Sequence, residues 1–330
     1  MGDVIMSSKV RLARNFADLP FRDRMSITQS ELCSGRVLGV MKNLSEEYHY
    51  FPMQSISEEL RDRMLEKGLI TSELCGNEIP GSVLIRKDEK MSVMINEDDH
   101  LRILSFAPGD DLITAYRSAS ALEDAFASQL VFAFDDQWGY LTACPTNTGT
   151  GMRASVLMHL PVLTQQKQLG NAIQLASRLG MSLRGVYGEG NEALGNIYML
   201  SNQITLGRTE HEIIDTLSTV ARELNAMENA FREKSYGEDP AAFEDRVFRS
   251  VGALLYARRM EQKEFMSRWS DLRLACEHGL TAFPAAACDD LLIHAQPSHI
   301  SDYAEKHSLT GTPEENLSAY IRTILKPEVI

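Results

Sequence analysis

The sequence predicts an α+β protein in which an antiparallel β-sheet is flanked by helices and followed by a helical C-terminal domain. Two observations support this class. Between residues 82 and 106, short apolar runs are separated by charged turns, as in the strands of a meander. After Thr209 the apolar residues recur with helical spacing. We therefore expect the sheet before residue 209 and mainly helices after it.

The first third of the chain predicts two outer helices and then three strands. Apolar spacing indicates helices over 28–45 and 57–67, with hydroxyl caps at Thr28 and Ser57. Glu31 follows Thr28 by three residues, which is the pattern of a capping box. The expected antiparallel strands cover 82–85, 91–95 and 101–106.

The middle of the chain alternates between the two element types. We expect helices over 111–129 and 170–179, and strands over 139–143, 153–160, 183–187 and 197–200. Thr209, followed by early acidic residues, predicts the start of a long helix that runs to Lys234. Gly237 and Pro240 then punctuate two helical patterns, so we place a domain boundary there and predict domains 1–237 and 238–330.

Composition limits the class of protein. The chain has 330 residues, 44% of them hydrophobic, which is enough for one large and one smaller domain. A net charge of −13 disfavours nucleic acid and anionic membranes as partners. The absence of a secretory signal pattern or a long apolar run makes the cytoplasm the expected location. The five cysteines show no metal-site or disulfide spacing, and all but Cys144 are expected to be packing residues.

The segment Cys144–Ser155, CPTNTGTGMRAS, concentrates residue types that suit phosphoryl transfer to nitrogen. Its Thr and Asn side chains supply short hydrogen-bond donors, and its glycines allow the backbone to approach a ligand. Arg153 can hold a pair of anionic oxygens with its planar fork. The segment is therefore a candidate phosphate site with one thiol, Cys144, beside it.

This string and its continuation, 156–161, resemble the signature of the guanidino kinases, also called phosphagen kinases, and especially their bacterial protein-arginine kinase branch. Three further segments resemble family motifs and occur in the family order. They are Ser7–Asn15, Asn96–Arg102 and Arg184–Ala193. The resemblance runs from about residue 7 to 210, and more weakly beyond. It implies a guanidino-kinase-like catalytic domain built on a large antiparallel sheet.

The resemblance also implies ATP and Mg²⁺ as cofactors, with no protein side chain assigned to the metal. The residues implied to hold the ATP phosphates are Lys9, Arg11, Arg102, Arg153 and Arg184. The residues implied to act on the substrate guanidinium are Asp98, Glu189 and Cys144. In this interpretation the two carboxylates orient one nitrogen and one of them accepts its proton, while a Cys144 thiolate helps to fix the group. His100 is expected to have a structural hydrogen-bonding role.

The sequence departs from the family pattern at two of these positions. Lys9 replaces an arginine, which keeps the charge but loses bidentate geometry. Asp98 replaces a glutamate that is one methylene longer, and a displacement of about 1 Å can cost about a hundredfold in rate. In addition, 313–320 reads PEENLSAY where the branch carries an Arg-Asp-x-x-Arg-Ala motif that receives phosphoarginine. We therefore do not expect that receptor in this chain.

Three functions remain open at this point. The first is a protein-arginine kinase, which the family links to marking proteins for Clp-type proteolysis under stress. The helical C-terminal region favours it. The short segment before the first motif favours it too, because small-molecule phosphagen kinases place a large helical domain before this motif and only six residues precede it here. The second is a kinase for free arginine. The third, motivated by Lys9 and Asp98, is an inactive pseudokinase that binds nucleotide or a partner.

The expected partners follow from the first function. They are arginine-containing protein substrates, which an acidic chain attracts at low salt. An activator protein, a Clp chaperone–protease and a second copy in a homodimer are left open as further partners. A Ser/Thr/Tyr protein kinase is disfavoured, since its Gly-rich loop, His-Arg-Asp and Asp-Phe-Gly motifs are missing.

Overall fold

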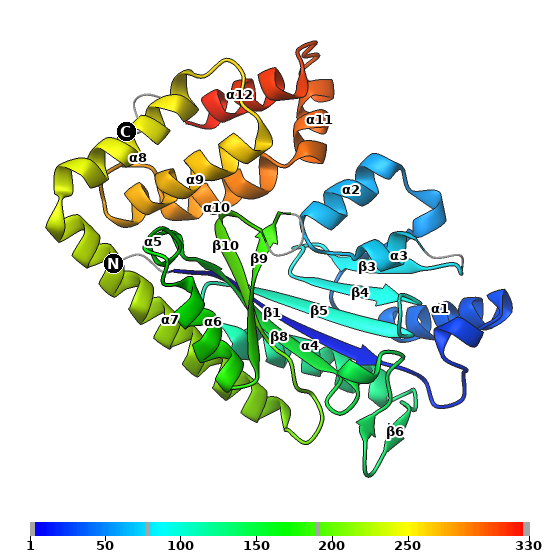
Figure 1. Cartoon of the computed structure of the whole chain (residues 1–330). Helices are drawn as coiled ribbons and strands as arrows, with labels where there is room; N and C mark the ends of the chain where they lie inside the picture. Colours follow the sequence, from blue (N-terminus) through cyan, green and yellow to red (C-terminus); the bar gives the residue numbers. More distant parts are fainter. Residues whose placement is uncertain (1–3, 77–78, 189–191, 326–330) are drawn as a thin grey trace.

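The computed structural model describes residues 4–76, 79–188 and 192–325, and its centre is an eight-stranded sheet (Figure 1). The strand order is β2-β3-β4-β5-β1-β8-β10-β9, and each pairing is antiparallel. The strands are β1 Ile5–Arg14, β2 Tyr48–Pro52, β3 Ser82–Arg86, β4 Met91–Ile95, β5 Leu101–Pro108, β8 Met152–His159, β9 Met181–Tyr187 and β10 Ala193–Asn202. The predicted α+β class with an antiparallel sheet is confirmed.

One predicted strand is largely wrong. In the segment 139–143, only β7, Gly139–Tyr140, pairs with another strand, and it forms a small hairpin with β6, Phe134–Asp135. Beyond it, the Ala143 amide donates to the Asp99 carboxylate (2.7 Å). A side chain thus satisfies the backbone group that a strand would have used, and the chain enters a 3₁₀ turn at Pro145–Asn147 instead.

The helices follow the apolar patterns, with one error at a cap. Helix α1, Ile27–Met41, begins after Ser26 and not at Thr28, and it ends before residue 45. Ser26 and Gln29 form a reciprocal capping box, so Gln29 takes the role that the sequence suggested for Glu31. The other helices of this part are α2 Glu58–Glu66, α3 Ser72–Cys75, α4 Leu112–Ala127, α5 Pro161–Gln165 and α6 Leu169–Arg178.

The C-terminal part of the chain is helical, as predicted. Helix α7, Glu210–Glu238, has a capping box formed by Thr209 and Glu212, and it continues through Gly237. The chain turns at Asp239, which caps α8. The remaining helices are α8 Pro240–Tyr256, α9 Gln262–Glu277, α10 Ala285–His294, α11 Pro297–Lys306 and α12 Pro313–Ile324. Among the described residues, no helix is both long and apolar enough to cross a bilayer.

The two faces of the sheet are covered differently. One face forms a continuous apolar core with α1, α4, α6 and α7. The other face is covered in two places: by α2 and α3 over β3, β4 and β5, and by α8–α12 at the end of β8, β9 and β10 (Figure 1). These two covers meet, because Glu66 of α2 accepts from the Ser298 amide (2.9 Å) and pairs with His299 (2.8 Å), both on α11.

Candidate functional site

Strand register places four of the predicted cationic residues on one face of the sheet. Lys9 and Arg11 are two residues apart on β1, so their side chains point the same way. Arg11 lies directly opposite Arg153 on β8, and Ala13, two residues further on, lies opposite Arg102 on β5. Because cross-strand partners share a face, Arg102 and Arg153 join Lys9 and Arg11.

Arg184 reaches the same face from β9 through an intervening strand. Ser201 on β10 is opposite both Ser155 on β8 and Ser182 on β9. Ser155 is two residues from Arg153, and Ser182 is two residues from Arg184, so both arginines share the face of Ser201. We name the five side chains together the cationic face: Lys9, Arg11, Arg102, Arg153 and Arg184.

The cationic face carries more positive charge than its surroundings compensate. Burial, together with Arg11 and Arg102, lowers the pKa of Lys9 to about 8. Burial, together with Arg102 and Arg153, likewise lowers the pKa of Arg11 to about 10. The buried Arg11 Nε has no hydrogen-bond partner among the described residues. Cations that destabilise one another fit a polyanion such as a nucleotide phosphate chain, because the ligand would supply the missing negative charge.

Arg102 differs from the other cations because carboxylates surround it. Its Nη1 donates to Glu97, and its Nη2 lies 3.3 Å from Asp98 Oδ2. Glu97 is fully buried and also accepts from Thr71 Oγ1 at 2.5 Å; burial raises its pKa, and Arg102 opposes that effect. Sequence reasoning missed Glu97. Three acids follow one another at 97–99, and no periodicity in this turn indicated which of them would face inward.

Asp98 is the acid that this turn leaves accessible. Its side chain is 39% exposed, whereas those of Glu97 and Asp99 are fully buried. The contact with Arg102 holds the Asp98 carboxylate at the border of the cationic face. A carboxylate in this place can accept hydrogen bonds from a cation that approaches from solvent.

Two residues near Cys144 tie its segment to the cationic face and to the acidic residues at 97–99. Arg11 Nη2 donates to Asn147 Oδ1 (3.2 Å), and the Asp99 carboxylate holds the Ala143 amide. Cys144 itself is half-buried, with its Sγ 3.0 Å from Thr146 Oγ1. The structure therefore places Cys144 directly before the turn whose Asn147 contacts Arg11, on a loop fixed from both sides.

The glycines of this loop have a packing role that the sequence did not suggest. A Cβ at Gly149 would lie 2.4 Å from the Thr205 carbonyl oxygen, and one at Gly151 would lie 2.6 Å from the Ala13 carbonyl oxygen. Their φ angles of +114° and +60° are also unfavourable for other residues. The glycines thus allow the loop to pack against its own chain. That they also bring the backbone close to a ligand stays a prediction.

His100 has the structural role expected of it. Its Nδ1 accepts from the Phe16 amide (2.9 Å), and its Nε2 lies 2.9 Å from the Pro20 carbonyl oxygen. The first contact places the ring proton on Nε2, so the second is a donated hydrogen bond. Burial lowers the pKa of His100, which keeps the ring neutral. His100 thereby joins the end of β1 to the turn at 97–99, which we name the acidic turn.

The remaining predicted residue, Glu189, lies outside the described residues. Arg184, on the strand that precedes it, is exposed, and its charge lowers the pKa of Arg153 in addition to the larger effect of burial. Among the described residues, no group of three or more His, Cys, Asp or Glu side chains is arranged to hold a metal ion.

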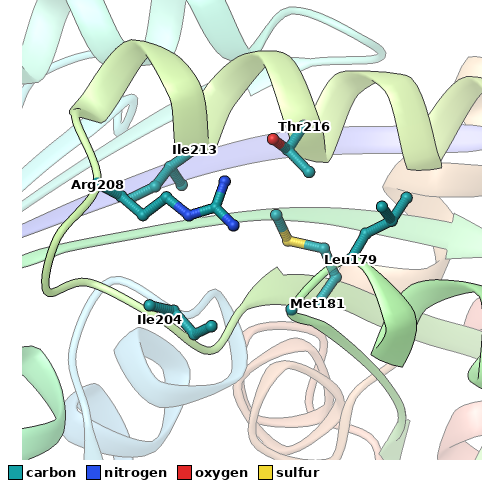
Figure 2. Close-up of a pocket in the computed structure, with 7 residues that line it drawn as sticks. Leu179, Met181, Ile204, Arg208, Ile213 and Thr216 are labelled. Atoms are coloured by element: carbon teal, nitrogen blue, oxygen red, sulfur yellow. The ribbon is translucent and has the colours of Figure 1, made fainter.

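A pocket on the opposite side of the sheet takes no part in this arrangement. Figure 2 shows it between the end of α6, the start of β9 and the start of α7, with Arg208 extending over it. Its other labelled lining residues are Leu179, Met181, Ile204, Ile213 and Thr216. Met181 is one residue from Ser182 on β9, so it faces away from the cationic face. The mainly apolar lining offers no catalytic groups.

Comparison with known families gives two matches along the chain. Residues 32–231 match the ATP:guanido phosphotransferase C-terminal catalytic domain, and residues 240–328 match the protein-arginine kinase McsB C-terminal domain. The protein-arginine kinase of Caldanaerobacter subterraneus subsp. tengcongensis is 40% identical over 302 residues, which cover 90% of each chain. That of Shouchella clausii is 38% identical over 331 residues, covering 99% of this chain and 92% of the relative.

Solved structures of guanidino kinases share the fold of this chain. The duplicated taurocyamine kinase from Schistosoma mansoni superposes with a TM-score of 0.62 and 28% identity over 69% of this chain and 34% of that longer one. Lombricine kinase superposes with a TM-score of 0.63 over 70% of this chain and 67% of that one; at 22% identity this likeness concerns the fold alone. The matched domains and the relatives together establish that the chain belongs to the guanidino kinase family, in its protein-arginine kinase branch.

Proposed function

We propose that this chain is an ATP:protein-arginine phosphotransferase, which transfers the γ-phosphoryl group of ATP to arginine side chains of proteins. The observation that carries the proposal is the cationic face, in which Lys9 and Arg11 lie close to further cations, with the exposed carboxylate of Asp98 at its border. Family membership supports ATP as the phosphoryl donor. We further propose residues 1–237 as the catalytic domain and 238–330 as a helical accessory domain.

In this proposal the cationic face holds the triphosphate. Arg11, Arg153 and Arg184 would neutralise the charge that spreads over the phosphoryl oxygens as the transferring group separates from ADP. Lys9 would contribute a point charge in place of a bidentate contact. Mg²⁺ would arrive bound to the phosphate oxygens of the nucleotide, since this ion favours oxygen ligands and keeps several waters.

The guanidinium side of the reaction falls to Asp98, Glu189 and Cys144. A guanidinium nitrogen forms the new bond to the γ-phosphorus, the bond to the ADP oxygen breaks, and the nitrogen gives its proton to a carboxylate. Arg102, which Glu97 holds in turn, contacts Asp98 and would orient its carboxylate for this step. Arg102 therefore serves as the positioning residue of the acidic turn in addition to its proposed phosphate contact.

An exposed apolar hairpin next to the site supports a protein substrate over free arginine. In the β6–β7 hairpin, Phe134 is 57% and Trp138 is 48% exposed, and Asp136 adds an exposed carboxylate. The hairpin adjoins the Cys144 loop, because Tyr140 forms a β-bridge with Gly149. Exposed aromatic side chains beside an active site are typical of a surface that contacts another macromolecule.

The cellular role is also part of the proposal. We place the enzyme in the cytoplasm, where it would mark arginine-containing proteins for a Clp chaperone–protease during stress. An activator protein and a homodimer would be compatible with this role, whereas nucleic acid and membrane binding would not fit the net charge of −13.

The test is incubation of the purified chain with ATP, Mg²⁺ and an arginine-rich protein, with acid-labile phosphate measured by phosphorus NMR. We expect protein-bound phosphoarginine that falls by about a hundredfold or more in Asp98→Asn and Glu189→Ala. Asp245→Asn, an exposed acid on α8, is the matched control and should change nothing.

Two outcomes would replace the proposal with an alternative. Transfer to free arginine alone would make the chain a metabolite kinase. Nucleotide binding without any transfer, with activity gained in Asp98→Glu, would make it a binding protein that lost catalysis through the shorter side chain.

A further inference from the structure

Two cysteines of the C-terminal helices lie in contact, far along the chain from the Cys144 loop. Cys276 near the end of α9 and Cys288 in α10 have their sulfur atoms 3.5 Å apart, although both are free thiols (α9 and α10 in Figure 1). Cys288 is fully buried, whereas Cys276 is partly accessible. A disulfide has an S–S distance of about 2.05 Å, so the pair needs a further approach of about 1.5 Å to bond.

The two thiols have different surroundings. Cys276 Sγ lies 3.2 Å from Thr281 Oγ1, and its contacts with Cys288 and this hydroxyl lower its pKa. The contact with Cys276, together with burial, raises the pKa of Cys288. The accessible thiol of the pair is thus also the one that more readily forms a thiolate, which is the arrangement of an attacking and a resolving cysteine.

We propose that Cys276 and Cys288 form a reversible intramolecular disulfide when the protein meets a hydroperoxide. The Cys276 thiolate attacks one peroxide oxygen, the O–O bond breaks, and the departing hydroxide takes up a proton to become water. The Cys288 sulfur then attacks the resulting sulfenic acid; the S–S bond forms, and the sulfenic oxygen leaves as water with the Cys288 proton. Two thiols and one hydrogen peroxide give one disulfide and two waters, and a dithiol reductant reverses the change.

The disulfide would act on an ion-pair network that joins the helices to the sheet. Glu277 follows Cys276, Asp289 follows Cys288, and both acids pair with Arg273, with Asp289 Oδ1 2.8 Å from its Nε. Arg273 Nη1 in turn lies 3.4 Å from His159 Nδ1 at the end of β8. Drawing the two sulfurs together therefore shifts both acids around Arg273.

His159 links this shift to the proposed active site. It is on β8, the strand that presents Arg153, and it also contacts Ser270 Oγ on α9 (2.7 Å). We accordingly expect the oxidised protein to have a lower rate of phosphoryl transfer. The formation of the disulfide does not depend on the proposed function, whereas this effect on rate does.

The first measurement is the chemical state of the full-length, fully reduced protein after treatment with hydrogen peroxide. We expect a loss of two hydrogens in intact mass, a fall in free thiols from five to three, and a cross-linked peptide pair containing residues 276 and 288. Dithiothreitol should restore the starting state. Cys75→Ser, which alters another partly accessible cysteine, should form the same cross-link.

Two results would overturn the disulfide. One is oxidation of Cys276 to the sulfinic acid without a cross-link. The other is consumption of peroxide by other cysteines while Cys276 and Cys288 remain open to alkylation in the unfolded protein. Both results are obtained with the natural sequence, so they do not depend on whether a cysteine variant folds.

A second measurement tests the coupling to activity. Peroxide should slow phosphoryl transfer more in the natural chain than in Cys276→Ser. Dithiothreitol should restore the rate of the natural chain and so remove this difference. Oxidation of Cys144 would lower the rate of both chains equally, so it does not affect the difference between them. Equal losses in the two chains would refute the coupling. If neither chain transfers phosphate, the proposed function fails while the mass measurement still decides the disulfide.

Discussion

The surroundings of Lys9 determine its pKa and make it sensitive to a bound anion. Its ammonium group donates to the Gly68 carbonyl oxygen (3.3 Å) and lies 5.0 Å from the centre of the Phe106 ring, so it is half-buried beside Arg11. Burial and the neighbouring cations favour its neutral form, which accounts for a pKa of about 8. A bound polyanion favours the charged form, and this difference makes binding depend on pH.

We predict that nucleotide affinity falls as pH rises above about 8. Below this pH, Lys9 is already charged in the free protein, so binding needs no proton. Above it, binding must take up one proton, and affinity falls by up to about tenfold per pH unit. Titration calorimetry in buffers of different ionisation enthalpy measures this uptake. Lys9→Arg should bind without it, and equal proton uptake by the two chains would contradict the prediction.

The acidic turn shows where residue-level prediction reaches its limit. The family resemblance selected Asp98 from three adjacent acids, and the structure leaves its carboxylate exposed. Glu97 and Asp99 are buried partners of Arg102 and of the Ala143 amide, and neither role was predicted. Their partners lie far away in the sequence or depend on the turn itself, whose Asn96 has a φ of +56°. Local patterns cannot identify contacts of this kind.

At the scale of elements, the Cys144 loop depends on close backbone packing. Gly149 adopts a φ of +114° against the Thr205 carbonyl oxygen, and Thr205 Oγ1 donates to the Thr146 and Thr148 carbonyl oxygens (3.0 and 2.7 Å). The segment after β10 thereby fixes the loop that bears the thiol. The glycines were recognised in the sequence, but the segment against which they pack was not.

We predict that Gly149→Ala displaces this loop. The added Cβ would meet the Thr205 carbonyl oxygen at 2.4 Å. The change should lower the free energy of unfolding by about 1–3 kcal/mol and reduce turnover, because the strain must be relieved by moving the loop. Gly35→Ala in α1, where nothing lies within 4 Å, is the control and should be neutral or stabilising. Urea unfolding and phosphoryl-transfer rates measure both effects; unchanged rates in Gly149→Ala would argue against the loop's role.

The β6–β7 hairpin provides a second prediction at this scale. Replacing Trp138 or Phe134 by serine should raise the KM for a protein substrate by about tenfold, the equivalent of about 1.4 kcal/mol of lost contact. Transfer to a short arginine peptide should be unchanged, because the hairpin lies beside the cationic face and not on it. Tyr256→Ser, which removes an exposed aromatic from α8, is the control. Equal effects on protein and peptide would indicate a structural role for the hairpin.

At the scale of the whole molecule, a buried charge network joins the helical region to the sheet. Arg232 of α7 pairs with Glu228 (2.8 Å) and with Glu277 of α9, and it donates to the His159 carbonyl oxygen (3.2 Å). Glu228 also accepts from the amides of Val162 and Leu163 at the start of α5 (3.0 and 2.9 Å). One network thus connects α5, α7 and α9 with β8.

We predict that Arg232→Met destabilises the protein strongly. It would leave the carboxylates of Glu228 and Glu277 without their shared partner, and breaking a buried pair in this way costs about 3–5 kcal/mol. Lys234→Met, an exposed position on the same helix, should shift the free energy of unfolding by less than about 0.5 kcal/mol. Urea unfolding followed by circular dichroism distinguishes the two variants. A similar small shift in both would show that the network contributes little to stability.

The order and type of most elements and the antiparallel sheet could be predicted from the chain alone, and the family resemblance selected the cationic residues. These features depend on periodicity, capping and motifs, which involve residues close together in the sequence. Which residues meet depends instead on how the elements pack together. Strand register brings Arg11 opposite Arg153, the acidic turn buries Glu97 against Arg102, and helix packing places Cys276 against Cys288. Such contacts join residues through the packing of separate elements, and no local pattern in the chain encodes that packing.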